Sequence, residues 1–193
     1  MKNGSQISKM ENEPKIEIVA ATAQDAEGIQ EVFYRTWLAT YPNEEVGITV
    51  EDIEDRFKDR QSEEKLTKRR KEILNPTDGI MLIAKENNEI IGLCRIGKRG
   101  DNNQLQAIYV LPEYQGRGIG KLLWSEAQKF LDSKKDTIVQ VATYNENAID
   151  FYGKLGFQDT KKRFSDEKFT MKSGAIIPEM EMIKKADDKQ ETD

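Results

Sequence analysis

The chain of 193 residues, 37% of them hydrophobic, is long enough for one domain around a single core. It has no histidine and a single cysteine, which excludes Ser-His-Asp and Cys-His catalysis, Cys/His zinc sites and an internal disulfide. No apolar run approaches the ~20 residues of a membrane span, and the formal net charge of −5 argues against a general attraction to nucleic acid. We therefore expect a cytoplasmic protein without a membrane or nucleic-acid partner.

The first part of the chain predicts one strand followed by three helices. Residues 15–20 alternate polar and apolar side chains, which is typical of an edge strand. Thr22, with Asp25 three residues later, is typical of a helix start. The apolar spacing and the helix-breaking Pro42 and Pro76 then predict helices over residues 22–41, 49–59 and 62–74.

The remainder alternates strands with two helices. Polar turns at residues 86–88 and 98–103, and a polar bridge at residues 163–173, separate apolar runs. The predicted strands are residues 80–84, 89–96, 104–110, 137–143, a strand from 157 onward and 178–183, and the predicted helices are residues 119–131 and 145–155. This order predicts the α+β (mixed α/β) class. We expect one domain over residues 15–184 between disordered ends at 1–14 and 185–193.

The stretch from Leu105 to Phe130 carries the main functional signal. A run of β-branched and aromatic residues ends at Pro112, and the glycine loop, Gln115 to Gly120 (QGRGIG), leads directly into an amphipathic helical pattern. Three glycines let several backbone N–H groups face one bound oxyanion, and the helix N-terminus adds unpaired N–H groups and the positive end of its dipole. This geometry suits a phosphate.

The spacing of the glycine loop fits neither of two common phosphate-binding motifs. A Walker A loop requires a hydroxyl after Gly-Lys, but Gly120-Lys121 is followed by Leu122. A dinucleotide fingerprint requires a third glycine at position 121 and a repeated parallel βαβ unit, and residue 121 is lysine. An ATP loop is therefore excluded and a dinucleotide site is disfavoured.

Two motifs in this order resemble those of the GNAT superfamily of acyl-CoA N-acyltransferases. Gln115, Gly118 and Gly120 match its motif A, and residues 145–157 (NENAIDFYGKLGF) match its motif B. The resemblance is specific from about residue 80 to residue 157. It implies a GNAT-like fold with a mixed, mostly antiparallel sheet whose fourth and fifth strands splay apart. It also implies acetyl-CoA as co-substrate, without a metal.

The implied reaction moves an acetyl group from acetyl-CoA to a primary amine of a small molecule or peptide by direct attack in a ternary complex. The acidic loop after the first helix and the segment Trp37 to Tyr41 (WLATY) loosely resemble the bacterial polyamine N-acetyltransferase branch. The resemblance leaves homodimerisation open.

The resemblance extends to residues that bind coenzyme A. The backbone of the glycine loop is expected to hold the pyrophosphate, with charge added by Arg117 and Lys121. The pantetheine arm is expected to run like an extra strand beside residues 108–110. The Val110 N–H is the expected donor to the oxyanion. Asn145 is expected to bind the pantetheine amide, to cap a helix, or both. The predicted cofactor-binding residues are Ile108, Tyr109, Val110, Gln115, Gly116, Arg117, Gly118, Ile119, Gly120, Lys121 and Asn145.

The predicted catalytic residue is Tyr152. It matches the motif B tyrosine that, by resemblance to the GNAT superfamily, is expected to be the general acid for the leaving thiolate. The alternative is a tyrosine that only packs in the core. Many relatives carry a glutamate near the start of the fourth strand, but this position is Gln104, which leaves the base unassigned. That departure keeps open a second hypothesis, a non-catalytic acyl-CoA sensor. A third hypothesis, an oligomeric scaffold, requires a glycine loop buried against a partner.

The residues that bind the acceptor are predicted from the loop after the first helix and its neighbourhood. Glu44 and Glu45 are candidates for the base, for contacts to a cationic amine, or for plain solvated charges. Trp37 and Tyr41 are candidates for the acceptor wall, with helix packing as the alternative for Trp37. Together with Gln104, these four are the predicted substrate-binding residues.

Overall fold

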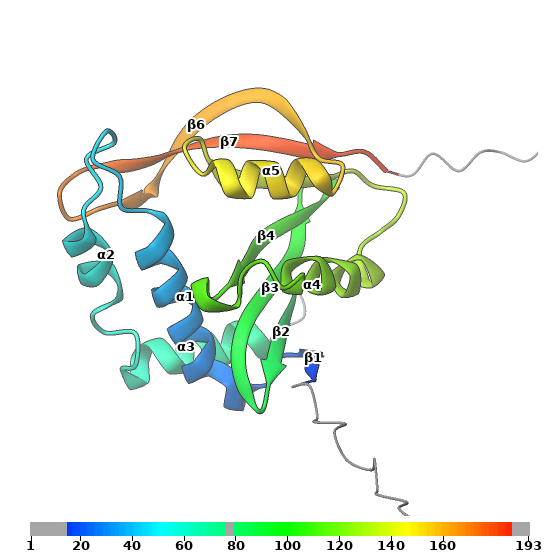
Figure 1. The fold of residues 1–193 in the computed structure, drawn as a ribbon, viewed down its shortest axis with the longest axis horizontal. Helices are drawn as coiled ribbons and strands as arrows, with labels where there is room; N and C mark the ends of the chain where they lie inside the picture. Colours follow the sequence, from blue (N-terminus) through cyan, green and yellow to red (C-terminus); the bar gives the residue numbers. More distant parts are fainter. Residues whose placement is uncertain (1–14, 76–78, 187–193) are drawn as a thin grey trace, which may run out of the picture.

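One mixed sheet of seven strands, in the order β1-β2-β3-β4-β5-β7-β6, forms the centre of the molecule (Figure 1). The structure, a computed structural model, describes residues 15–75 and 79–186. The strands are β1 (Ile16–Ala20), β2 (Ile80–Glu86), β3 (Glu89–Arg99), β4 (Asn102–Val110), β5 (Thr137–Ala142), β6 (Gln158–Thr170) and β7 (Ile176–Lys184). The β4–β5 pair is parallel and the other neighbouring pairs are antiparallel. The predicted α+β class with a mostly antiparallel sheet is confirmed.

The helices lie on both faces of this sheet. They are α1 (Ala26–Thr40), α2 (Val50–Phe57), α3 (Glu63–Leu74), α4 (Ile119–Ala127) and α5 (Glu146–Lys154). Figure 1 shows α1, α2 and α3 on one side of strands β2 to β4 and α4 on the other, with α5 alongside β6 and β7. No helix in the described ranges has the length and apolar character of a membrane span.

Side-chain caps fix where the first helices begin. Both the backbone N–H and the hydroxyl of Thr22 donate to the Asp25 carboxylate, at 2.8 and 2.7 Å, in a 3-10 turn that leads into α1. Thr49 and Asp52 form a reciprocal capping box at the start of α2. Thr22 and Thr49, small polar residues that precede an apolar pattern, therefore predicted the starts of these two helices to within about one helical turn.

Three apolar clusters tie the layers together. One lies between the sheet and α4 and α5, and includes Leu123, Trp124 and Tyr152. A second lies between the sheet and α1, and the third joins α1, α2, β5 and β7. Because α1 and α4 pack on opposite faces, the strands between them have buried side chains on both faces.

β4 and β5 diverge after a short paired segment. They pair only over residues 103–105 and 137–139. Beyond this segment β4 continues to pair with β3 as far as Val110, and β5 with β7 as far as Ala142. Residues 106–110 and 140–142 therefore face one another across a gap without strand pairing, as the resemblance to the GNAT fold implied.

Most elements agree with their predicted bounds to within a few residues, and three differences affect the type or length of a segment. The predicted turn at residues 98–103 shortens to residues 100–101, because β3 and β4 continue to the sheet end with polar side chains. The predicted polar bridge at residues 163–173 is largely strand, since β6 runs to Thr170. β6 is an edge strand with interrupted pairing and many exposed side chains, so its composition resembles that of a loop. The helix predicted over residues 119–131 ends as an α-helix at Ala127 and continues as a 3-10 turn.

The predicted disordered extension at residues 1–14, and most of the predicted disordered tail, lie outside the described residues. Lys185 and Ala186 are described, and both contact the Asp136 carboxylate, at 2.9 Å each. The chain therefore stays in contact with the sheet two residues beyond the predicted domain end at Lys184.

Candidate active site

A cleft of about 910 Å³ opens where β4 and β5 separate. Its walls come from α1 and β4, the glycine loop, the start of α4, the end of β5, and α5. Because α1 and α4 pack on opposite faces of the sheet, the cleft passes through the sheet between the two strands. The predicted site residues that line it are Tyr41, Ile108, Tyr109, Val110, Gln115, Gly116, Gly118, Ile119, Gly120, Lys121, Asn145 and Tyr152.

Glycine backbone shapes the loop at one end of the cleft. Gly116 and Gly118 have φ values of 76° and 79°, in the left-handed region that residues with a Cβ avoid. The N–H groups of residues 116–120 make no hydrogen bond to any described residue. Five neighbouring free N–H groups at the N-terminus of α4 suit an anion such as a pyrophosphate.

Two side chains of the glycine loop fix it to the sheet. Gln115 donates from Nε2 to the Val110 carbonyl at 3.0 Å. Arg117 forms an ion pair with the largely buried Glu86 of β2, and its guanidinium lies 5.3 Å from the centre of the Tyr114 ring. Arg117 is not among the residues that line the cleft, because its side chain pairs with Glu86 of β2. Its contact with a pyrophosphate stays a prediction.

The backbone of β4 presents hydrogen-bonding groups to the cleft. Leu111 donates its N–H to the Ile91 carbonyl on β3, at 2.9 Å. Since successive N–H groups of an extended strand point to opposite sides, the N–H of Val110 faces away from β3, toward the cleft. This orientation suits the predicted oxyanion donor.

Asn145 and Tyr152 are both on the side of α5 that borders the cleft. Asn145 caps α5, because its Oδ1 accepts from the Ala148 N–H at 3.1 Å, and its Nδ2 makes no hydrogen bond to a described residue. The two roles predicted for Asn145 are therefore compatible. Burial raises the pKa of Tyr152 far above its ordinary value, which keeps the phenol protonated at neutral pH, the form that a general acid needs.

A group of three tyrosines, which we term the tyrosine end, closes the cleft toward α1. The hydroxyls of Tyr41 and Tyr109 are 3.1 Å apart, and the Tyr144 hydroxyl donates to the Tyr41 carbonyl at 3.0 Å. Burial raises the pKa of each of these phenols, that of Tyr144 to about 12. The tyrosine end is therefore uncharged at neutral pH and offers hydroxyl groups for hydrogen bonding.

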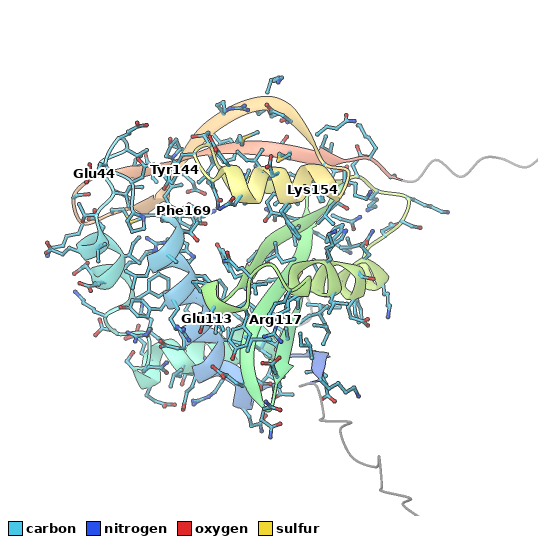
Figure 2. All side chains as sticks on the ribbon, in the orientation of Figure 1. Glu44, Glu113, Arg117, Tyr144, Lys154 and Phe169 are labelled. Carbon is cyan, nitrogen blue, oxygen red and sulfur yellow. The ribbon has the colours of Figure 1, made fainter. Side chains whose placement is uncertain are left out.

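Four predicted substrate-binding residues do not line the cleft. Gln104 lies in the paired part of β4, opposite Ile138, before the strands diverge. Glu44 and Glu45 are exposed, and Figure 2 places Glu44 at the outer edge of the molecule. Trp37 is 7% exposed and packs in the third apolar cluster, with the Arg56 guanidinium 5.0 Å from its ring centre. Of the predicted acceptor residues, Tyr41 alone lines the cleft.

Sequence reasoning missed several side chains that line the cleft. Two of them, Gln140 and Tyr144, had a signal in the sequence: Gln140 is a polar residue inside an apolar strand, and Tyr144 follows that strand directly. Further missed residues include helix positions with no distinct pattern: Thr36, Ala39, Thr40, Glu146, Asp150 and Lys154.

The sequence is similar to those of known acetyltransferases. Residues 33–157 match the model of the acetyltransferase (GNAT) family. A spermidine N(1)-acetyltransferase of Thermoplasma acidophilum is 30% identical over 146 residues, which are 74% of this chain and 88% of that protein. A thialysine N-epsilon-acetyltransferase of Bos taurus is 41% identical over 63 residues, 32% of this chain and 37% of that protein.

Solved structures agree with the sequence relatives. The PaiA N-acetyltransferase of Thermoplasma acidophilum, in complex with coenzyme A, has a TM-score of 0.69 at 28% identity, over 89% of this chain and 99% of that chain. At the level of the fold alone, YncA from Salmonella typhimurium, a putative acetyltransferase solved with acetyl-CoA, has a TM-score of 0.59 at 19% identity, over 93% of this chain and 98% of that chain. Together with the family match over more than half of the sequence, these comparisons establish that the chain is an enzyme of the acetyltransferase (GNAT) family.

Proposed function

We propose that this enzyme transfers the acetyl group of acetyl-CoA to a primary amine of a small molecule or peptide, by direct attack in a ternary complex. The observation that carries the proposal is the divergence of β4 and β5 next to the free N–H groups of residues 116–120. An anion site and an unpaired strand edge then lie along one cleft, which suits a ligand with a pyrophosphate at one end and an amide-containing arm at the other.

Acetyl-CoA is the co-substrate, and its parts suit different segments of the cleft. The pyrophosphate suits the glycine loop and the N-terminus of α4. The pantetheine arm suits the unpaired edge of residues 106–110, with the Asn145 amide within the same cleft. The relatives solved with coenzyme A and with acetyl-CoA support this choice of co-substrate.

The reaction requires charge stabilisation and proton transfers. The amine nitrogen attacks the thioester carbonyl carbon, and the Val110 N–H is suited to stabilise the developing oxyanion. An acceptor that binds as an ammonium must first release one proton to solvent to become nucleophilic. The new C–N bond then forms as the C–S bond breaks, the nitrogen loses a second proton, and the leaving thiolate gains one. Tyr152 is the proposed donor of that last proton, and its buried phenol is in the protonated form that the step requires.

Aliphatic, positively charged amines are the acceptor class that we propose first. The 30% identical relative is named as a spermidine N(1)-acetyltransferase, and its match covers most of both chains. The tyrosine end adds hydroxyl oxygens that can accept hydrogen bonds from an ammonium group. Amines of the polyamine type are therefore the first acceptors to test, followed by lysine-like amines and peptide N-termini.

The alternative of a non-catalytic acyl-CoA sensor has no support in the cleft. Its motivation was Gln104 in place of a carboxylate, and Gln104 does not line the cleft. The identity of residue 104 therefore gives no reason to doubt catalysis.

Thiol release tests the proposed function. The purified protein is mixed with acetyl-CoA and a thiol-trapping dye, with and without spermidine, lysine or a short peptide. We expect thiol release that depends on the amine, and a rise in thermal unfolding midpoint with acetyl-CoA that ATP and NAD do not produce. Thiol release that no amine accelerates contradicts the proposal.

A further inference from the structure

Two buried glutamates of β7 lie two residues apart and differ in their partners. Glu179 is 9% exposed and Glu181 is 5% exposed. Glu181 pairs with Lys162, at 2.9 Å, and with Arg99, at 3.6 Å. Glu179 has no ion pair with a described residue, and its buried Oε2 has no hydrogen-bond partner among them. A buried carboxylate without a partner is costly, so its presence in this fold requires an explanation.

The two cross-strand neighbours of Glu179 differ in size. Its partner on β5 is Ala142, and its partner on β6 is Phe164. Cross-strand partners place their side chains on the same face of a sheet. A methyl group therefore flanks the carboxylate toward the cleft, and an aromatic ring flanks it toward the sheet edge.

The charge of Glu179 acts on the tyrosine end. Ala142, its cross-strand partner, packs in the third apolar cluster together with Tyr41, Tyr109 and Tyr144, which places Glu179 beside the tyrosine end. The carboxylate adds to the larger effect of burial in raising the pKa of both Tyr41 and Tyr109. The indole of Trp37 lies at the same place, since its ring centre is 4.5 Å from that of Tyr41 and its N–H acts on the Tyr109 hydroxyl. The unpartnered Oε2 of Glu179 is therefore the polar atom that requires an explanation here.

We propose that Glu179 gives the tyrosine end its selectivity for a positively charged amine, acting as a positioning residue through the hydroxyls of Tyr41 and Tyr109. The inference rests on the proposed function and adds the element that recognises the acceptor. A phenol oxygen accepts a hydrogen bond from an ammonium group, and the charge of the buried carboxylate, which makes no hydrogen bond to either hydroxyl, polarises the pair and adds to this attraction. The acceptor class is an aliphatic primary ammonium.

The pH dependence of acceptor binding follows from this arrangement. Burial raises the pKa of Glu179, so the carboxylate becomes neutral at a higher pH than an exposed glutamate does. As pH falls through that pKa, the attraction disappears and the KM for the amine rises. The charged and titratable groups that act on Glu179 or feel its charge are Lys168 and Asp166 of β6, Arg99 of β3, Tyr41 of the segment after α1 and Tyr109 of β4.

Paired variants test the inference on the full-length enzyme with spermidine as the probe. For Glu179→Gln we expect the KM for spermidine to rise about tenfold or more. The further rise in this KM that the wild type shows at low pH is expected to be absent in the variant. The KM for acetyl-CoA is expected to stay unchanged, and Glu179→Asp, which keeps the charge, is expected to recover part of the affinity. Glu181→Gln is the matched control, with a wild-type KM for spermidine and a lower unfolding midpoint, because Lys162 and Arg99 lose their partner.

Each outcome bears on one proposal or on both. An active wild type in which Glu179→Gln leaves the KM for spermidine unchanged, or raises it no more than Glu181→Gln does, overturns the inference and leaves the proposed function standing. A wild type that acetylates no amine overturns both. The unfolding midpoint of Glu179→Gln separates loss of recognition from loss of folding, since removal of an unpaired buried charge is expected to leave it unchanged or higher.

Discussion

Gly120 of α4 faces the ring of Phe151 on α5 so closely that a Cβ at position 120 would lie 3.2 Å from two of the ring carbons. The two helices that border the cleft therefore touch at the residue that ends the glycine loop. Gly120→Ala is expected to push α4 and α5 apart by a few tenths of an ångström and to raise the KM for acetyl-CoA several-fold, about three- to tenfold. Steady-state kinetics with acetyl-CoA as the varied substrate measure this effect.

The matched control for that substitution is Gly153→Ala, in the same helix pair. A Cβ at Gly153 of α5 meets no atom within 4 Å, and the residue has an ordinary helical backbone. We expect Gly153→Ala to leave the KM for acetyl-CoA unchanged and to stabilise the fold by about 0.5 kcal/mol, because alanine favours a helix over glycine. Equal kinetic effects of the two substitutions contradict the role of the Gly120–Phe151 contact.

Arg117 and Glu86 offer a second test of how the glycine loop is held. Because Arg117 pairs with Glu86 rather than lining the cleft, the loop depends on both partners. We expect Arg117→Ala and Glu86→Gln to raise the KM for acetyl-CoA by similar factors of about two to five, and the double variant to be no worse than either alone. If Arg117 instead binds the pyrophosphate directly, Glu86→Gln leaves that KM unchanged or lowers it while Arg117→Ala raises it.

Tyr152→Phe tests the proposed general acid. Removal of the hydroxyl is expected to lower kcat by about a hundredfold or more, with the KM for acetyl-CoA nearly unchanged, because the phenol acts on the leaving thiolate rather than on the bound ground state. Burial raises the pKa of Tyr152, so its ionisation should not produce an alkaline limb in the wild-type pH profile below about pH 10. Unaltered turnover in an assay limited by chemistry removes the role from this residue.

The parts of the site that follow local rules were predictable from the sequence. Glycine spacing, a helix N-terminus and the Asn145 cap are properties of short segments, and all appear in the structure where the pattern indicated them. The edge strand β6 was harder to recognise, because its exposed polar residues differ little from those of a loop. Local pattern therefore described the glycine-loop end of the cleft well.

The side toward α1 could not be predicted in the same way, because its contacts join distant segments. The hydroxyl pair joins Tyr41 and Tyr109, which are 68 residues apart, and Glu179 reaches the same region from β7. The acidic composition of the loop after α1 predicted Glu44 and Glu45 as acceptor-site residues, yet both are exposed. The sequence alone does not show which glutamate lacks a partner; that depends on cross-strand register, which places Lys162 beside Glu181 and Phe164 beside Glu179.

Asp52 provides a prediction about stability that is independent of catalysis. This buried carboxylate caps α2 through Thr49 and accepts hydrogen bonds from the Ser173 N–H and hydroxyl, at 2.8 and 2.9 Å, which ties α2 to the turn between β6 and β7. Asp52→Ala is expected to lower the free energy of unfolding at pH 7 by about 2 to 3 kcal/mol, because two N–H groups lose a charged acceptor. Urea unfolding measures the loss, and the exposed Glu54→Ala on the same helix is the control.

The pH dependence of that loss follows from the pKa of Asp52. Burial alone raises this pKa, but hydrogen bonds from Thr49 and Ser173 outweigh it and lower the pKa from 3.8 to about 2. The folded protein therefore binds fewer protons at this site than the unfolded chain, so the stabilisation by Asp52 is full above about pH 4 to 5 and declines as pH falls toward 2. The difference in unfolding free energy between wild type and Asp52→Ala should shrink accordingly between pH 5 and pH 2. A difference that stays constant over this range contradicts the ionised carboxylate as the source of the stabilisation.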